Sequence, residues 1–220
     1  MATSRYAQPG YVTIHRITGI VALVITSGFL TAGTLRAGDA ETSPSRKQMS
    51  QDQLIKLALS AAPARIAKEA AVMVQGEDGK LVEAKKGTNG FTCVPMADPN
   101  VPTLDPMCMD QAGFQWLTSL INKEPKPANT APSITFMAKG AHGWVKDRKL
   151  LPKEEQGARL VHFPPHWMIS WPFDSKTSGF PDCARDPEKV ARSGSTCIAE
   201  DGSPSAFLVI YQDPAKLKLK

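Results

Sequence analysis

The sequence lacks the short motifs that identify most common catalytic and cofactor sites. It contains no C-x-x-C pair, no C-x-x-C-H haem-attachment motif, no G-x-S-x-G and no phosphate-binding glycine loop. These absences exclude a c-type cytochrome and leave no motif for a nucleotide-binding enzyme or an α/β-hydrolase. We expect no cofactor.

The sequence also lacks a strong excess of charge. Its 26 Lys and Arg residues nearly balance 21 Asp and Glu residues, for a net charge of +5. That balance is too mild to indicate a nucleic-acid partner. The tail K-L-K-L-K at residues 216–220 is locally basic, and we interpret it as a solvated terminus.

One long uncharged run is present, near the N-terminus. Residues 1–16 carry Arg5, His15 and Arg16 without an acidic residue, and residues 17–35 are free of charge. This pattern predicts a signal peptide over residues 1–40, cleaved after Ala40 or nearer Gly33. The run also approaches the roughly 20 residues that span a bilayer, so a retained anchor contacting the membrane through residues 17–35 is the alternative. Either interpretation places residues 41–220 outside the cytoplasm, in a periplasmic or secreted domain or one anchored to the inner membrane.

The chain has four cysteines, all after the targeting segment. An even number in an oxidising compartment predicts two disulfides. Of the three possible connectivities we favour the local one, Cys93–Cys108 and Cys183–Cys197, because each pair brackets a turn-rich loop. A loop of about 15 residues closed in this way contributes roughly 3 kcal/mol on the chain-entropy model.

Hydrophobic periodicity and turn signals predict a single α+β domain with a small, mainly antiparallel sheet and two or three helices. Helices are expected over residues 50–62, where Ser50 and Gln53 form a capping box, and over residues 110–122. Pro63 either ends the first helix or starts a second short one through Ala70. Strands are expected over residues 71–74, 80–84 and 91–94, which would form an antiparallel meander, and over residues 133–137, 166–171 and 206–211. Long loops are expected over residues 94–106, 138–160 and 172–205, with disulfides closing the first and third.

Three segments resemble a group of small, uncharacterised secreted bacterial proteins. They are KGTNGFTC at residues 86–93, DPMCMD at residues 105–110 and PHWMISWPFD at residues 165–174. The resemblance implies a bacterial exported domain over most of residues 50–212, and it implies no activity.

Three histidines, His142, His162 and His166, are the candidate metal ligands. His162 and His166 have H-x₃-H spacing, and Met107, Met109 and Met168 could add soft ligands for copper or zinc. The intervening Pro164 and Pro165 prevent the helix that would place both histidines on one face. The competing interpretation is that these histidines end turns and strands and are hydrogen-bonded locally.

Other side chains give weaker signals. Trp167, Ile169 and Trp171 share one face of a predicted strand, which indicates core or, if open, a docking surface. The turn serines, which could serve a hydrolase, have no supporting motif: Ser193, Ser195, Ser203 and Ser205. Asp174 and Asp182 are better explained as turn formers than as a glycosidase pair.

These observations favour an exported, non-catalytic binding or accessory domain that serves an unknown protein partner or a cell-envelope complex. A periplasmic metal-binding protein that uses His142, His162 and His166 is the second hypothesis. A small hydrolase of unrecognised type is the third.

Overall fold

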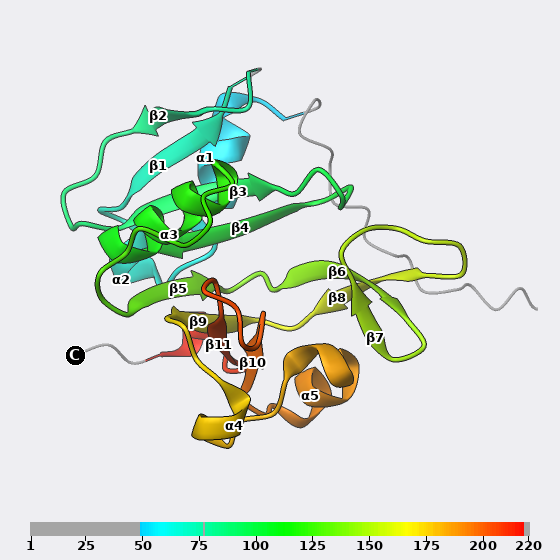
Figure 1. The fold of residues 1–220 in the computed structure, drawn as a ribbon. Helices are drawn as coiled ribbons and strands as arrows, with labels where there is room; N and C mark the ends of the chain where they lie inside the picture. The colour runs from blue at the N-terminus through cyan, green and yellow to red at the C-terminus, as the bar shows by residue number, and fades with distance from the viewer. Residues whose placement is uncertain (1–48, 77, 218–220) are drawn as a thin grey trace, which may run out of the picture. The chain divides into compact units, whose positions relative to one another are not determined.

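A large β-sheet with helices on both faces organises the chain (Figure 1). The computed structural model describes residues 49–76 and 78–217, which all belong to the unit formed by Glu41–Lys220. The predicted signal or anchor segment lies outside these residues. Within the described part, no helix is both long and apolar enough to cross a membrane.

The helices of the described chain are short, and most begin at a side-chain cap. They are α1 (Gln51–Leu59), α2 (Ala64–Ala67), α3 (Gln111–Ile121), α4 (Ser175–Ser178) and α5 (Pro187–Ser193), with 3₁₀ turns η2 (Cys183–Arg185) and η3 (Pro214–Lys216). The predicted capping box of α1 is confirmed, because Ser50 accepts from the Gln53 amide and Gln53 accepts from the Ser50 amide. Asp110 caps α3 as predicted.

The strands form one sheet of eight and one of three. They are β1 (Ala71–Gln75), β2 (Leu81–Lys85), β3 (Thr92–Ala97), β4 (Leu104–Met109), β5 (Ser133–Met137), β6 (Ala141–Lys146), β7 (Lys149–Leu151), β8 (Arg159–Phe163), β9 (His166–Ser170), β10 (Cys197–Ala199) and β11 (Phe207–Ile210). The large sheet has the order β10-β11-β9-β5-β4-β3-β1-β2, and the small one β7-β6-β8. The predicted α+β fold with a mostly antiparallel sheet is confirmed, but the sheet is larger than expected.

The predicted loop over residues 94–106 is wrong, because most of it belongs to the β3–β4 hairpin. Cys93 lies opposite Cys108 in that hairpin, and Pro95 lies opposite Pro106. The two cysteine Cα atoms are only 3.9 Å apart, as in the pairs of an antiparallel ladder that exchange no hydrogen bonds. Since the prolines share that parity, their missing N–H groups cost this hairpin no hydrogen bond.

The predicted meander is also wrong. β1 and β2 form the expected antiparallel hairpin, but β3 returns to the other side of β1 and runs parallel to it. Residues 86–91 make this crossing, and Asn89 anchors them by donating to the Ile66 carbonyl at 2.7 Å. At Gly87 an added Cβ would lie 2.1 Å from the Ala71 backbone nitrogen, so only glycine fits this crossing.

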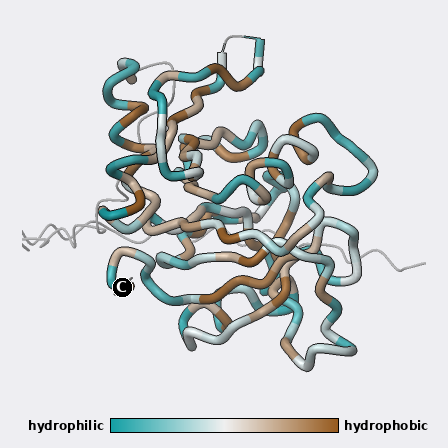
Figure 2. The backbone as a smooth tube through the Cα atoms, turned by 90° about the vertical axis from the view of Figure 1, so that its left-hand side faces the viewer, coloured by the Kyte–Doolittle hydropathy of each residue, from teal (hydrophilic) through white to brown (hydrophobic). Residues whose placement is uncertain are grey.

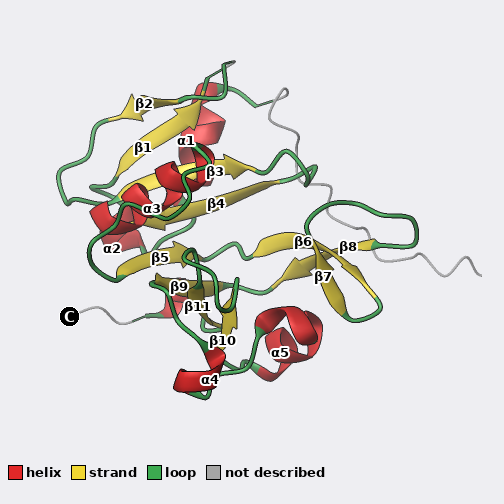
Figure 3. Ribbon diagram, viewed as in Figure 1, coloured by secondary structure: helices red, strands yellow, loops and turns green. Residues whose placement is uncertain are grey.

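The two faces of the large sheet carry separate hydrophobic clusters. Helices α1 and α2 cover one face over Val72, Cys93 and Phe136, and α3 covers the other over Met107 and Met109 (Figure 3). Hydrophobic stretches follow the central strands, whereas the outer loops are mostly hydrophilic (Figure 2). Side chains at alternate positions of β4 therefore enter different clusters, which places the Cys93–Cys108 disulfide on the face opposite α3.

The predicted loop over residues 138–160 is wrong as well, because it contains β6, β7 and the start of β8. The β6–β7 turn places Asp147 and Arg148 at φ values of 49° and 63°. Two positive φ values define the tight hairpin turn that sequences usually mark with Asn-Gly or Asp-Gly. Without that signal, the hairpin could not be identified from the sequence.

The small sheet continues the β5–β9 hairpin with an extra residue on one side. Met137 lies opposite His166 in the large sheet, and Ala141 lies opposite Phe163 in the small one. Three residues on one strand therefore face two on the other, as in a β-bulge, and the hairpin changes sheets there. Gly140 has φ +72°, and a Cβ at that position would lie 2.0 Å from the Phe163 carbonyl oxygen.

Residues 172–205 contain more regular structure than the predicted irregular loop. They hold α4, η2, α5 and β10, and Cys183–Cys197 links η2 to β10. Three of the caps in this segment are aspartates: Asp174, Asp182 and Asp186. Elements of three to seven residues are too short to show a hydrophobic period, so the sequence could not reveal them.

Candidate functional site

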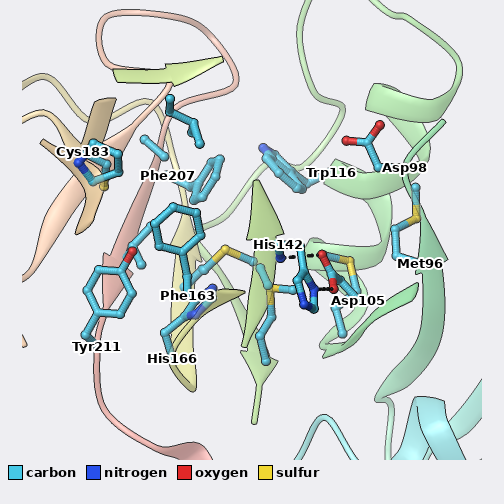
Figure 4. Close-up of a pocket in the computed structure, with 18 residues that line it drawn as sticks. Met96, Asp98, Asp105, Trp116, His142, Phe163, His166, Cys183, Phe207 and Tyr211 are labelled. Carbon is cyan, nitrogen blue, oxygen red and sulfur yellow. Dashed lines mark hydrogen bonds and ion pairs between the residues drawn. The ribbon is translucent and has the colours of Figure 1, made fainter. Parts of the chain in front are cut away.

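A mainly apolar pocket of about 320 Å³ lies on the α3 side of the large sheet (Figure 4). Its lining comes from the large sheet, the small sheet, α3, and the segment pinned by Cys183–Cys197. The sulfur-containing side chains in the lining are Met96, Met107, Met137, Met168 and Cys183. Its aromatic side chains are Trp116, Phe163, Phe207 and Tyr211, and its ionisable side chains besides tyrosine are Asp98, Asp105, His142 and His166.

Strand register places a thioether directly beside an imidazole in this pocket. Met137 on β5 lies opposite His166 on β9. On the other side, β4 pairs with β5 through Cys108 opposite Phe136, and one step further along the same register Met107 comes beside Met137. Because residues opposite each other on one face have Cβ atoms about 4.5–5.5 Å apart, Met107, Met137 and His166 form a continuous row across three strands.

His166 is held in a defined orientation at one end of this row. The residue is 5% exposed, and its Nδ1–H donates to the Pro164 carbonyl at 2.8 Å. Burial lowers the pKa of His166 below its usual 6.5, so the ring is neutral at physiological pH. With the proton on Nδ1, Nε2 keeps its lone pair.

A second imidazole lies on the wall that the small sheet provides. His142 on β6 donates from Nδ1 to the Asp105 carboxylate at 2.7 Å, and the His142 backbone N–H donates to the other carboxylate oxygen at 2.7 Å. This paired contact appears in Figure 4. His162, opposite His142 on β8, has its ring centroid 4.7 Å away and bonds to the Lys139 carbonyl. His162 does not line the pocket.

Aromatic rings close the side of the pocket nearest β11. Trp116 of α3 packs edge-on against Phe207, with ring centroids 5.4 Å apart. Tyr211 lies 5.5 Å from the His166 ring, and burial raises the Tyr211 pKa to about 12. The phenol therefore stays protonated and neutral at physiological pH.

Ion pairs hold α5 against the small sheet on the remaining side. Arg148 contacts Asp186 at 2.6 Å, and Arg159 contacts Glu188. These guanidinium groups lower the pKa of both carboxyl groups. Because Cys183 and Pro187 of this segment line the pocket, the contacts help to position one of its walls.

The structure separates the predicted site residues into groups. Both predicted disulfides, Cys93–Cys108 and Cys183–Cys197, are confirmed. His142 and His162 lie together, and His142 and His166 share the pocket. Over the described ranges, however, no three His, Cys, Asp or Glu side chains form a group that could hold a metal ion.

Sequence reasoning missed Met137 and named Met109, which is buried beside α3 outside the pocket lining. Strand parity could have found Met137, because it ends the predicted strand of residues 133–137. Choosing it required the partner strand and its register. Trp167 and Ile169 are half-buried against separate clusters, whereas the face with His166, Met168 and Ser170 is more deeply buried.

The weaker hydrolase candidates have local roles. Ser193 and Ser195 are exposed and form a hydrogen bond with each other, and Asp174 and Asp182 cap short helices, as expected of turn formers.

The chain matches no family model, and no curated protein or solved structure is significantly similar to it. The interpretation of the site therefore depends on its geometry alone.

Proposed function

We propose that this protein is an exported, non-catalytic binding domain whose ligand occupies the methionine-lined pocket. The observation that carries the proposal is the pocket itself, which combines about 320 Å³ with a mainly apolar lining and a few oriented polar groups. Small-ligand sites have these properties. The two disulfides are typical of an oxidising compartment and support the exported location.

The chemistry of the lining favours binding over catalysis. Within the described chain, the lining holds no serine, threonine or unpaired cysteine that could act as a nucleophile. The Tyr211 phenol, with its raised pKa, is a poor substitute.

Ligand titration by NMR tests the proposal, with indole as a small apolar probe. We expect indole to shift backbone amide signals of β5, β9 and α3. Ala141→Phe should remove the effect, because Ala141 lines the pocket and a phenyl group would occupy it. Ala97→Phe is the matched control, at a half-buried strand end outside the lining. Shifts that persist in Ala141→Phe would place the ligand elsewhere.

One observation favours hydrolysis as a second candidate. Asp105 orients His142 as the carboxylate of a hydrolytic site orients its general base. If His142 activated a water molecule, the protein would hydrolyse p-nitrophenyl acetate, and His142→Gln would abolish the activity. Equal rates for the two proteins would remove this candidate.

A further inference from the structure

We propose that the pocket binds copper(I), with the thioether sulfurs of Met107 and Met137 and the imidazole Nε2 of His166 as ligands. The inference rests on the proposed function, since it names the ligand of the same pocket. It differs from the three-histidine site predicted from the sequence, because two of the three ligands are methionines and His142 and His162 are not among them.

The first argument is position. Met107, Met137 and His166 are on three neighbouring strands and share one face of the sheet. All three line the pocket, so an ion could reach them without unfolding the sheet. Met168 also lines the pocket, two residues along β9 from His166, and gives this face a further thioether.

The second argument is the preparation of the imidazole. A histidine that binds a metal through one nitrogen almost always donates its other N–H to a carbonyl or carboxylate, which fixes the ring. His166 makes this contact with the Pro164 carbonyl. Because Nδ1 is engaged in this contact, Nε2 is the nitrogen left to bind a metal ion.

The third argument is the softness of the ligands. Thioethers select copper(I), whereas zinc is bound by imidazole, thiolate and carboxylate groups, and magnesium and calcium by oxygen ligands. The described residues offer no group of three His, Cys, Asp or Glu side chains for such ions, and Asp105 is already engaged by His142. No lysine or arginine is among the described lining residues, while Asp98 and Asp105 contribute negative charge that favours a cation.

Competition with a chromophoric chelator tests the proposal. The disulfide-intact chain is titrated against the copper(I) complex of bathocuproine disulfonate. Oxygen is excluded, and ascorbate keeps the copper in the +1 state. We expect one copper(I) per chain, and Met137→Leu and His166→Leu should each weaken binding at least about tenfold. X-ray absorption of the loaded protein should show sulfur and nitrogen neighbours.

The matched control is Met109→Leu, because Met109 is a buried methionine on the same strand as Met107 but outside the pocket lining. It should bind copper(I) as tightly as the unaltered protein. Equal affinity in all variants, or failure of the unaltered protein to compete, would overturn the copper site. If His166→Leu does not fold, Met137→Leu and the absorption spectrum decide, since leucine replaces methionine with little change in volume.

The indole titration separates this inference from the proposed function. Indole binding without copper(I) binding would remove the copper inference and leave the ligand pocket intact. Failure of both probes would remove both proposals. Met137→Leu could weaken copper(I) binding while Ala141→Phe leaves it unchanged. That result would support the three proposed ligands and show that copper(I) does not need the pocket space beside Ala141.

Discussion

At the scale of single residues, the ionisation of His166 is coupled to the fold. It is buried beside Tyr211, lies within electrostatic reach of Asp105 and His162, and is constrained by the Pro164 carbonyl. Charging this ring would require either opening the pocket or solvating it within the core. The native packing around His166 therefore requires its ring to be neutral.

We expect the free energy of unfolding to fall as the pH decreases through and below about 6.5. The unfolded chain takes up a proton on His166 near pH 6.5, whereas the lowered pKa delays that uptake in the folded protein. Between the two pKa values the unfolded state binds more protons and gains stability. Urea unfolding at several pH values should show this decline, and it should be smaller in His166→Leu. Parallel pH profiles for the two proteins would contradict the assignment.

Gly140 is a second residue whose identity is restricted by its surroundings, because its backbone conformation and the nearby Phe163 carbonyl leave no room for a side chain. We expect Gly140→Ala to destabilise the protein by more than about 2 kcal/mol, because alanine would meet both the positive φ and the Phe163 carbonyl. Gly90→Ala is the control, with φ +77° and nothing within 4 Å of an added Cβ, and should cost about 1–2 kcal/mol. Urea denaturation midpoints measure the stability of both variants. Equal losses of stability would show that the structure relieves the close contact at Gly140 at no cost.

At the scale of elements, the two disulfides close loops of similar length in different surroundings. Cys93–Cys108 joins strands already paired over six registered positions, on the face opposite the pocket. Cys183–Cys197 joins a 3₁₀ turn to the edge strand β10, where few backbone hydrogen bonds would replace it. The second disulfide therefore controls a pocket wall, whereas the first supports a hairpin.

Replacing either pair with alanine should cost about 3 kcal/mol, since the loops are alike in length. Only Cys183→Ala with Cys197→Ala should also increase amide exchange in α5 and weaken indole binding. Hydrogen exchange and the indole titration measure these effects. Intact indole binding without Cys183–Cys197 would show that the ion pairs of α5 hold the wall unaided.

The elements also show where sequence patterns succeed. Capped helices such as α1 and α3 were predicted because Ser50, Gln53 and Asp110 give local signals that no partner strand can change. The β3–β4 hairpin was missed because its prolines indicate a loop until they are seen to face one another. The β6–β7 hairpin was missed because Asp147 and Arg148 adopt positive φ values without the usual glycine.

At the scale of the whole molecule, the exported location remains a proposal with a direct test. We expect the mature protein to begin after Ala40 and to carry four cysteines that react with a thiol reagent only after reduction. Intact mass spectrometry of the native protein, with and without reductant, measures both properties. Retention of Met1 would instead indicate an anchored protein, and thiols that react without reduction would contradict the oxidised state.

The sequence alone determined the properties that depend on neighbours along the chain. These include the capped helices, the α+β class and the local pairing of the cysteines, whose two disulfides join residues only 15 and 14 positions apart. Tertiary structure decided the parallel return of β3, the change of sheet at Gly140 and the pocket. Met107, Met137 and His166 are far apart in sequence, and only the register of three strands brings them into one row. Strand order and register depend on the packing of the whole core, which no local pattern specifies.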